Sequence, residues 1–372
     1  MKILHIPNYY NPHIGGIETV AEDIVNSLKD KHKQRVICFK DAKGTVTEEI
    51  NGVSVTRVGC ITKIASQSIA PGYKKELKKI MNEFKPDIVI FHYPNPFVAT
   101  FLKKYFKRDF KLVLYWHLDI VKQKILGKLF EPQTKALLKR ANKVIATSPN
   151  YIEGSKWLTQ YKNKTIVIPN CVSDDIDYIS DEVNQKSIKI KEENKNKTII
   201  FALGRHVEYK GIIHLVNASK YLNDSFKIYI AGKGPLTDSL KEASKDDEKI
   251  TFLGRVDQVD LKAYLNACDI FAFPSITKNE AFGIALAEAM ALEKASVTFT
   301  IPGSGVNYVS LNNETGIEVP NMDEKAFADA LIKLQQDSTL RQKYAHAAKE
   351  RCDSLFRFKE FKENILKLVE EL

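Results

Sequence analysis

The sequence predicts an α/β protein of two domains, each built around a doubly wound parallel sheet. The chain has 372 residues, which is too long for one ordinary hydrophobic core and fits two domains of roughly 150 to 200 residues. Short apolar strand patterns alternate with helical patterns along most of the chain. The composition is 44% hydrophobic and 27% charged, which is typical of globular proteins and excludes disordered and fibrous classes.

The first predicted domain covers residues 1–175 and begins with a strand at 2–7 (KILHIP). The helical spacing of apolar residues at 17–28 (IETVAEDIVNSL) predicts the first helix. A second helix is predicted at 74–84. Apolar runs that suit strands buried on both faces follow at 35–39, 53–58, 87–93, 111–117, 143–148 and 165–169.

The second predicted domain covers residues 176–353. Residues 170–197 are polar and charge-rich, so we predict an interdomain connection and a surface segment there. Predicted strands and helices then alternate at 198–204, 211–222, 226–232, 236–245, 250–254, 261–268 and 269–275. Residues 354–372 form an amphipathic pattern that predicts a helix docked back on the first domain.

The net charge of +10 is concentrated in one region of the sequence. Between Pro71 and Lys124, twelve Lys and Arg residues stand against five Asp and Glu residues. A nucleic-acid-binding protein is one interpretation, but the sequence has no recognised binding module, and we predict no nucleic-acid partner. The proposed use is contact with an anionic membrane surface, and the alternative is a core-packed helix with ordinary solvated lysines. The lysine and arginine residues proposed for it are Lys74, Lys75, Lys78, Lys79, Lys103, Lys104, Lys107 and Arg108.

The sequence shows no apolar run that approaches the length of a membrane span, and the stretch before Pro7 is too short for a signal peptide. Five scattered cysteines without a C-x-x-C pair predict reduced thiols. We therefore expect a cytoplasmic protein, peripheral at the inner face of the membrane.

Two cationic side chains follow the first strand of the second domain. Arg205 and Lys210 lie beyond its carboxyl end, where ligands bind in open α/β sheets, and two cations there would suit a diphosphate. The order Lys210-Gly211 excludes a Walker loop. A basic helix start with solvated side chains is the alternative. Gly232 and Gly234 imitate a dinucleotide fingerprint, but the third glycine is absent, and a tight turn explains both.

The stretch 279–290 (NEAFGIALAEAM) holds two glutamates in an otherwise apolar run. A helix starting near Gly283 would offer free N–H groups and a positive dipole end to a phosphate. Glu288 would lie on an apolar helix face, where a carboxylate needs donors such as the two hydroxyls of a ribose. Glu280 could reach hydroxyls at the other end of a nucleotide sugar. The alternative is a salt bridge from Glu288 to Lys294, with Glu280 as an acid before the helix.

Together these residues resemble the retaining glycosyltransferases of family 4, which have the GT-B fold of two Rossmann-like domains facing across a cleft. The resemblance covers essentially the full chain. It is carried by Gly15-Gly16, His117 in YWHLD, Gly204-Arg205, Lys210-Gly211, Gly232-x-Gly234-Pro235, and the pair Glu280 and Glu288 around Gly283. Within the family, HLDIVKQKIL followed by ATSPNY is most similar to bacterial surface-polysaccharide mannosyltransferases.

The resemblance implies transfer of a hexose, with mannose from GDP-mannose favoured, from a nucleotide-diphosphate sugar to a glycan or lipid-linked glycan acceptor. It implies no cofactor and no metal. The residues implied to act at the reacting centre are His117, Glu280, Arg205 and Lys210. The residues implied to bind the donor are Gly15, Gly16, Val256, Phe282, Gly283, Ile284 and Glu288.

Each implied role has a definite chemistry. Arg205 and Lys210 would neutralise the charge that grows on the departing diphosphate. Glu288 would hold the ribose, and main-chain atoms near Val256 would read the base. His117 and Glu280 would contact the transferred sugar.

A GT-B sugar-nucleotide epimerase remains an alternative, because it would share the fold and use paired acids on a free nucleotide sugar. Asp175-Ile176-Asp177 has the form of a D-x-D metal motif, but it lies in the polar connection and is not expected to bind a metal. A phosphorylase would need a lysine bound to pyridoxal phosphate, for which the sequence gives no case.

Overall fold

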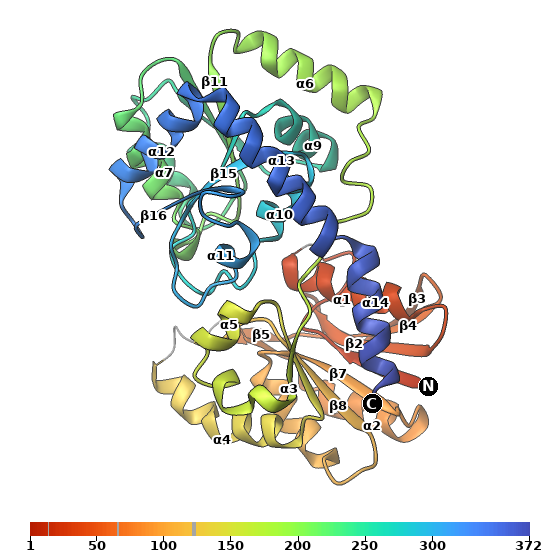
Figure 1. Ribbon diagram of the computed structural model, residues 1–372. Coiled ribbons are helices and arrows are strands. Elements are labelled where there is room, and N and C mark those ends of the chain that lie inside the picture. Colours follow the sequence, from red (N-terminus) through yellow and green to blue (C-terminus); the bar gives the residue numbers. More distant parts are fainter. Residues whose placement is uncertain (14, 65–66, 121–123) are drawn as a thin grey trace. The chain divides into compact units, whose positions relative to one another are not determined.

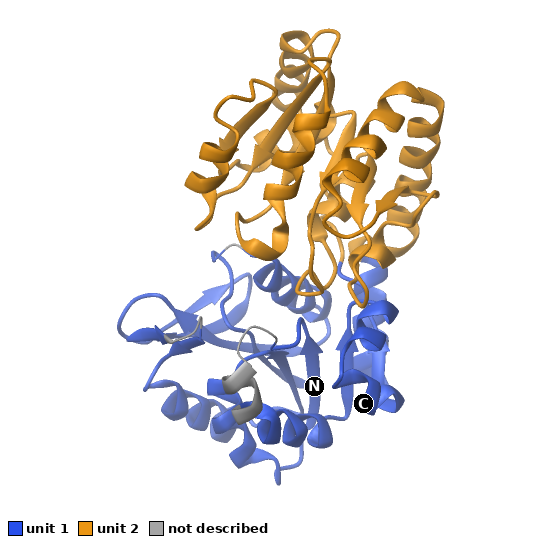
Figure 2. Ribbon diagram, turned by 90° about the vertical axis from the view of Figure 1, so that its left-hand side faces the viewer, with its two compact units in different colours: residues 1–170, 359–372 blue, residues 171–358 orange. Residues whose placement is uncertain are grey.

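The computed structural model describes residues 1–13, 15–64, 67–120 and 124–372 (Figure 1). The chain forms two compact units (Figure 2): unit 1 is Met1–Asn170 with Lys359–Leu372, and unit 2 is Cys171–Phe358. Unit 1 ends at Asn170, five residues before the predicted boundary at 175, because Val172 and Ile176 are buried in the core of unit 2. Phe356 is buried in the same core, so the chain leaves unit 2 after the predicted position 353.

Unit 1 contains an eight-stranded sheet in the order β10-β9-β8-β7-β1-β2-β4-β3. All neighbours are parallel except β3, which is antiparallel to β4. The strands are β1 (Lys2–Ile6), β2 (Lys33–Lys40), β3 (Val46–Ile50), β4 (Val53–Gly59), β7 (Ile88–Tyr93), β8 (Lys111–Trp116), β9 (Lys143–Ala146) and β10 (Thr165–Val167). A separate hairpin joins β5 (Thr62–Ile64) and β6 (Gln67–Ile69).

The helices of unit 1 cover this sheet. They are α1 (Gly16–Leu28), α2 (Tyr73–Glu83), α3 (Pro96–Leu102), α4 (Lys124–Arg140), α5 (Pro149–Gly154) and α14 (Phe358–Glu370). The C-terminal α14 belongs to unit 1 (Figures 1 and 2). It buries Phe361, Ile365, Leu368 and Val369. Ion pairs from Lys31 to Glu370 (3.4 Å) and from Lys362 to Asp30 (3.5 Å) flank the contact. Among the described residues, no helix is both long and apolar enough to cross a membrane.

Unit 2 contains a six-stranded, fully parallel sheet in the order β13-β12-β11-β14-β15-β16. The strands are β11 (Thr198–Leu203), β12 (Phe226–Ala231), β13 (Ile250–Gly254), β14 (Ile270–Phe273), β15 (Ala295–Phe299) and β16 (Gly316–Val319). The helices are α6 (Asp181–Glu193), α7 (Ile212–Ala218), α8 (Thr237–Ala243), α9 (Gln258–Ala267), α10 (Ile284–Ala291), α11 (Val306–Val309), α12 (Glu324–Gln336) and α13 (Ser338–Leu355).

The polar stretch 170–197 is not only a connection, because it contains helix α6. The Ser180 side chain caps α6, and a narrow stripe of Val183, Ser187 and Ile190 is buried. Lys186 pairs with Asp260 of α9 at 2.8 Å, which fixes the two helices together. A helix with so few large apolar groups gives a weak amphipathic signal, which is why the sequence pattern predicted no helix there.

Candidate active site

Except for Val256, the predicted site residues of unit 2 gather where β11 and β14 lie side by side. β11 pairs with β12 on one edge and with β14 on the other, so the strand order reverses at this point. In open α/β sheets, ligands bind at the carboxyl ends of the strands that flank such a reversal. Arg205 and Lys210 follow β11, while Glu280 and helix α10 follow β14.

Lys210 and Glu280 form an ion pair at this point through Nζ and Oε2. Their side chains are only 15% and 11% exposed, and the Lys210 ammonium also lies 5.2 Å from the centre of the Phe273 ring. Burial alone would lower the pKa of Lys210, but the Glu280 carboxylate outweighs it and the pKa is raised. Lys210 is therefore a charged group that already has a partner, and not a free cation.

Two serines hold Glu280 in place. Ser275 Oγ donates to Glu280 Oε2 at 3.3 Å, and Ser304 Oγ donates to the Glu280 carbonyl. Gly305 lies so close that an added Cβ would be 2.0 Å from the Ala281 carbonyl oxygen. The loop after β15 therefore supports the loop after β14. This support was not predicted, and its only sequence signal is the run Gly303-Ser304-Gly305 after a strand.

Helix α10 begins at Ile284 without a side-chain cap. Gly283, the N-cap residue, has φ 93°, a left-handed conformation that favours glycine. The main-chain N–H groups at this end therefore lack a side-chain acceptor. Phe282 is buried in the core.

Glu288 lies one turn further along α10 and is half-buried. Its carboxylate makes no hydrogen bond or ion pair with any residue that the structure describes. The salt bridge to Lys294 is not observed, because Lys294 Nζ donates to the Asn266 carbonyl at 3.1 Å instead. Burial raises the pKa of the Glu288 carboxyl to about 7. A carboxylate of this kind is ready to accept donors from a ligand.

Arg205 lies after the end of β11 and Val256 after the end of β13, with β12 between the two strands. Arg205 is exposed, and its guanidinium has no ion pair with a described residue, so it is available to an anion. Val256 is half-buried in the turn between β13 and α9, packed against the core of unit 2. The D-x-D acids are already paired: Asp175 with Lys262 at 3.0 Å, and Asp177 with Arg357 at 2.6 Å.

His117, Gly15 and Gly16 belong to unit 1, at the carboxyl ends of β8 and β1. His117 is buried, and its Nε2 lies 2.9 Å from Nδ1 of His92 on β7. Burial lowers the pKa of His117 to about 3, so its ring is neutral. Gly15 and Gly16 open α1, and the Glu18 carboxylate lies over Gly15 so closely that an added Cβ would be 2.3 Å from Oε2.

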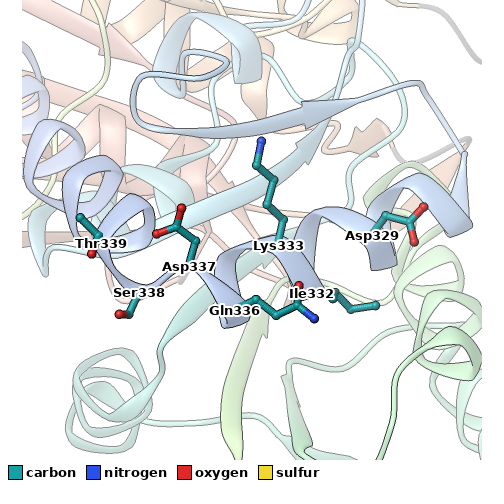
Figure 3. Close-up of a pocket in the computed structure, with 7 residues that line it drawn as sticks. All are labelled: Asp329, Ile332, Lys333, Gln336, Asp337, Ser338 and Thr339. Atoms are coloured by element: carbon teal, nitrogen blue, oxygen red, sulfur yellow. The ribbon is translucent and has the colours of Figure 1, made fainter.

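A hollow of about 650 Å³ lies elsewhere in unit 2, at the junction of α12 and α13 (Figure 3). It contains none of the predicted site residues. It is lined by Asp329, Ile332, Lys333, Gln336, Asp337, Ser338 and Thr339.

Two family models match the chain. The model described as Glycosyltransferase Family 4 matches residues 14–176, and the model described as Glycosyl transferases group 1 matches residues 183–351. Together they cover most of both units.

The chain is also similar to proteins of known role over nearly its whole length. It is 27% identical over 363 residues to O-antigen chain mannosyltransferase C of Escherichia coli, covering 96% of this chain and 94% of that protein. It is 29% identical over 365 residues to the D-rhamnosyltransferase WbpZ of Pseudomonas aeruginosa, covering 96% and 92%. Among solved structures, Anabaena Alr3699/HepE in complex with UDP and glucose has a TM-score of 0.81 at 17% identity, with 100% of both chains covered.

Proposed function

Because this chain belongs to the family 4 glycosyltransferases and has the GT-B fold, we propose that it transfers a hexose from a nucleotide-diphosphate sugar to a glycan or lipid-linked glycan acceptor. The proposal rests on the side chains and the helix start that lie where the strand order of the unit 2 sheet reverses. An exposed cation, an uncapped helix start and a half-buried carboxylate without a partner lie on the two elements that flank this point. The cation and the helix start suit a diphosphate, and the carboxylate suits a ribose.

The donor would be held by residues of unit 2. Arg205 and the N–H groups of Gly283 and Ile284 would bind the diphosphate, and Glu288 would accept the ribose hydroxyls. Glu280 would accept hydroxyls of the transferred sugar. Lys210, kept close by Glu280, would provide the second positive charge as the diphosphate leaves.

The proposed reaction retains the configuration of the sugar and needs no metal. The bond between the anomeric carbon and the phosphate oxygen breaks, and the acceptor hydroxyl oxygen bonds to that carbon on the same face. The departing phosphate oxygen takes the proton of the acceptor. Two cations would neutralise the leaving group, and Glu280, the carboxylate proposed to contact the sugar, is occupied by an ion pair with Lys210. This arrangement supports charge stabilisation rather than nucleophilic attack by a carboxylate.

The favoured donor is GDP-mannose in surface polysaccharide biosynthesis. Support comes from the similarity to an O-antigen mannosyltransferase and to a D-rhamnosyltransferase. The structural similarity to a protein in complex with UDP and glucose makes UDP-glucose the competing donor.

We further propose that the protein is cytoplasmic and binds the inner face of the membrane through unit 1. Arg108 Nη1 donates to the Met81 carbonyl at 3.0 Å, which joins the end of α2 to the segment after α3, and we propose that the exposed lysines of these two segments form one basic surface. Each exposed lysine near an anionic bilayer contributes about 1 kcal/mol of attraction. The exposed lysines of this surface are Lys74, Lys75, Lys78, Lys79, Lys103, Lys104 and Lys107.

The test is a comparison of GDP-mannose and UDP-glucose by calorimetry and thermal unfolding. A donor at 100 times its dissociation constant should add about 2.7 kcal/mol to the free energy of unfolding. Arg205→Ala is the matched variant, because the exposed guanidinium has no structural partner among the described residues and its loss should leave the stability of the unliganded chain unchanged. Failure of every nucleotide sugar to bind would refute the proposal. Conversion of the donor sugar without an acceptor would identify an epimerase instead.

A further inference from the structure

Three buried histidines cross the sheet of unit 1 near the carboxyl ends of its strands. His5 lies on β1, His92 on the adjacent β7, and His117 directly after β8, with exposed fractions of 0%, 1% and 6%. Burial lowers the pKa of His5 to about 4, of His117 to about 3, and of His92 well below its ordinary value. All three rings are therefore neutral, and each carries one N–H.

His92 and His117 share one hydrogen bond. Nδ1 of His92 lies 2.9 Å from Nε2 of His117, and the rings are stacked at 5.1 Å with 18° between their planes. In a neutral pair, one of these nitrogens must donate and the other must accept. The direction of the bond decides which nitrogen of His117 carries the proton.

The second ring nitrogen of His92, Nε2, indicates which way the hydrogen bond between His92 and His117 runs. Nε2 of His92 is buried and has no protein partner among the described residues. If Nδ1 accepted the bond, the proton of His92 would be on Nε2, as a buried N–H without an acceptor. Buried unsatisfied N–H groups are rarer than unsatisfied acceptors, so the lower-energy assignment leaves a lone pair on Nε2 and a proton on Nδ1.

His5 shows the same arrangement independently. Its Nε2 lies 2.7 Å from Oε1 of Gln34, an oxygen that can only accept, so Nε2 carries the proton. The amide orientation is fixed because Nε2 of Gln34 donates to the Val25 carbonyl at 3.0 Å. The buried unpartnered atom of His5, Nδ1, is then also a lone pair.

We propose that His92 is a positioning residue that fixes His117 in its Nδ1–H tautomer, so that His117 presents a hydrogen-bond donor to a ligand oxygen at the carboxyl edge of the unit 1 sheet. The only hydrogen bond of the His117 ring among the described residues is the one through Nε2, so Nδ1 has no partner there, and His117 is the least buried of the three rings. With Nε2 occupied by His92 and Nδ1 protonated, His117 cannot act as a base. That the ligand oxygen is a sugar hydroxyl rests on the proposed function, whereas the tautomer does not.

The tautomer is measured on the unliganded wild-type chain. Long-range ¹H–¹⁵N spectra of a ¹⁵N-histidine-labelled sample separate protonated from bare ring nitrogens, and the His117→Gln variant identifies the His117 signals by their loss. We expect Nδ1 of both His117 and His92 to be protonated. Protonation of Nε2 in His117 would overturn the proposal, whatever the enzyme is found to transfer.

Two variants test the positioning role. His92→Asn places an amide N–H where Nδ1 lies and should keep the Nδ1–H tautomer of His117, whereas His92→Leu removes the donor and should lose it. For the proposed transfer, His92→Leu should lower kcat/KM by about three- to tenfold, the worth of one neutral hydrogen bond, with nucleotide affinity unchanged. His92→Asn should restore it. Wild-type kinetics and tautomer in His92→Leu would refute the role of His92, while absence of transfer by the wild type would refute only the proposed function.

Discussion

Replacing Glu288 with glutamine should stabilise the folded chain at neutral and alkaline pH while weakening nucleotide binding. Burial on α10 raises the pKa of the Glu288 carboxyl from 4.5 to about 7. Between these values the folded chain holds a proton that the unfolded chain has lost. The free energy of unfolding therefore falls as the pH rises through this window. The stability that this carboxyl contributes is fully present below pH 4.5 and lost above about pH 7.

The size of the stability change follows from the difference between the two pKa values of Glu288. Each pKa unit is worth about 1.36 kcal/mol, so the ionised Glu288 carboxylate costs about 3 kcal/mol at pH 8. A neutral amide carries no such cost. Glu288→Gln should therefore raise the free energy of unfolding by up to about 3 kcal/mol at pH 8 and leave it unchanged at pH 4.

The same substitution should weaken binding of a nucleoside diphosphate. A hydrogen bond to a charged acceptor is worth about 1.5 to 3 kcal/mol, so we expect the dissociation constant to rise by about tenfold or more. In the wild type, affinity should increase as the pH rises toward about 7, where Glu288 ionises, and this dependence should disappear in the variant.

Urea unfolding at pH 4, 6 and 8, with calorimetry at the same pH values, measures both effects. Glu192→Gln, which removes an exposed carboxylate on α6 of the same unit, is the matched control and should change neither quantity. Equal stability of Glu288→Gln and wild type at every pH would refute the burial argument. Unchanged nucleotide affinity would refute the ribose contact.

Three further outcomes are expected. Lys210→Met should destabilise unit 2 by about 3 kcal/mol in urea unfolding, because it leaves the buried Glu280 carboxylate unpaired. The double variant with Glu280→Gln should recover the stability but not the turnover. Arg205→Ala should lower kcat by tenfold or more with no loss of stability. The kcat of the wild type should be unchanged in EDTA, and strict dependence on a divalent metal would contradict the charge-stabilisation mechanism. The protein should sediment with anionic but not neutral vesicles at low salt. It should be released at higher salt, because the Debye length falls from about 10 Å at 0.1 M to about 3 Å at 1 M. This sedimentation should weaken when four lysines become Gln: Lys74, Lys75, Lys78 and Lys79.

The alternation of strands and helices could be predicted because buried parallel strands are rich in apolar residues, as in β14, where all four residues are apolar and buried. Elements that bury little surface gave no such signal. β3 (VTEEI) is almost wholly exposed and, in the part of the chain that the structure describes, pairs with β4 alone, so it was absent from the predicted elements. Helix α6 was missed for the related reason that only a narrow stripe of it is buried.

For the site, the sequence alone determined which residue types are present and their local spacing: a glutamate before an uncapped helix, another on its apolar face, and cations after a strand. It could not determine which strands are neighbours. Lys210 and Glu280 are far apart in the sequence and meet because β11 pairs with β14. His92 and His117 meet because β7 pairs with β8. Lys294 could have neutralised Glu288, but its side chain reaches the Asn266 carbonyl instead. Only tertiary packing decides these partners, because hydrogen bonds and ion pairs depend on distances between side chains that local sequence does not specify.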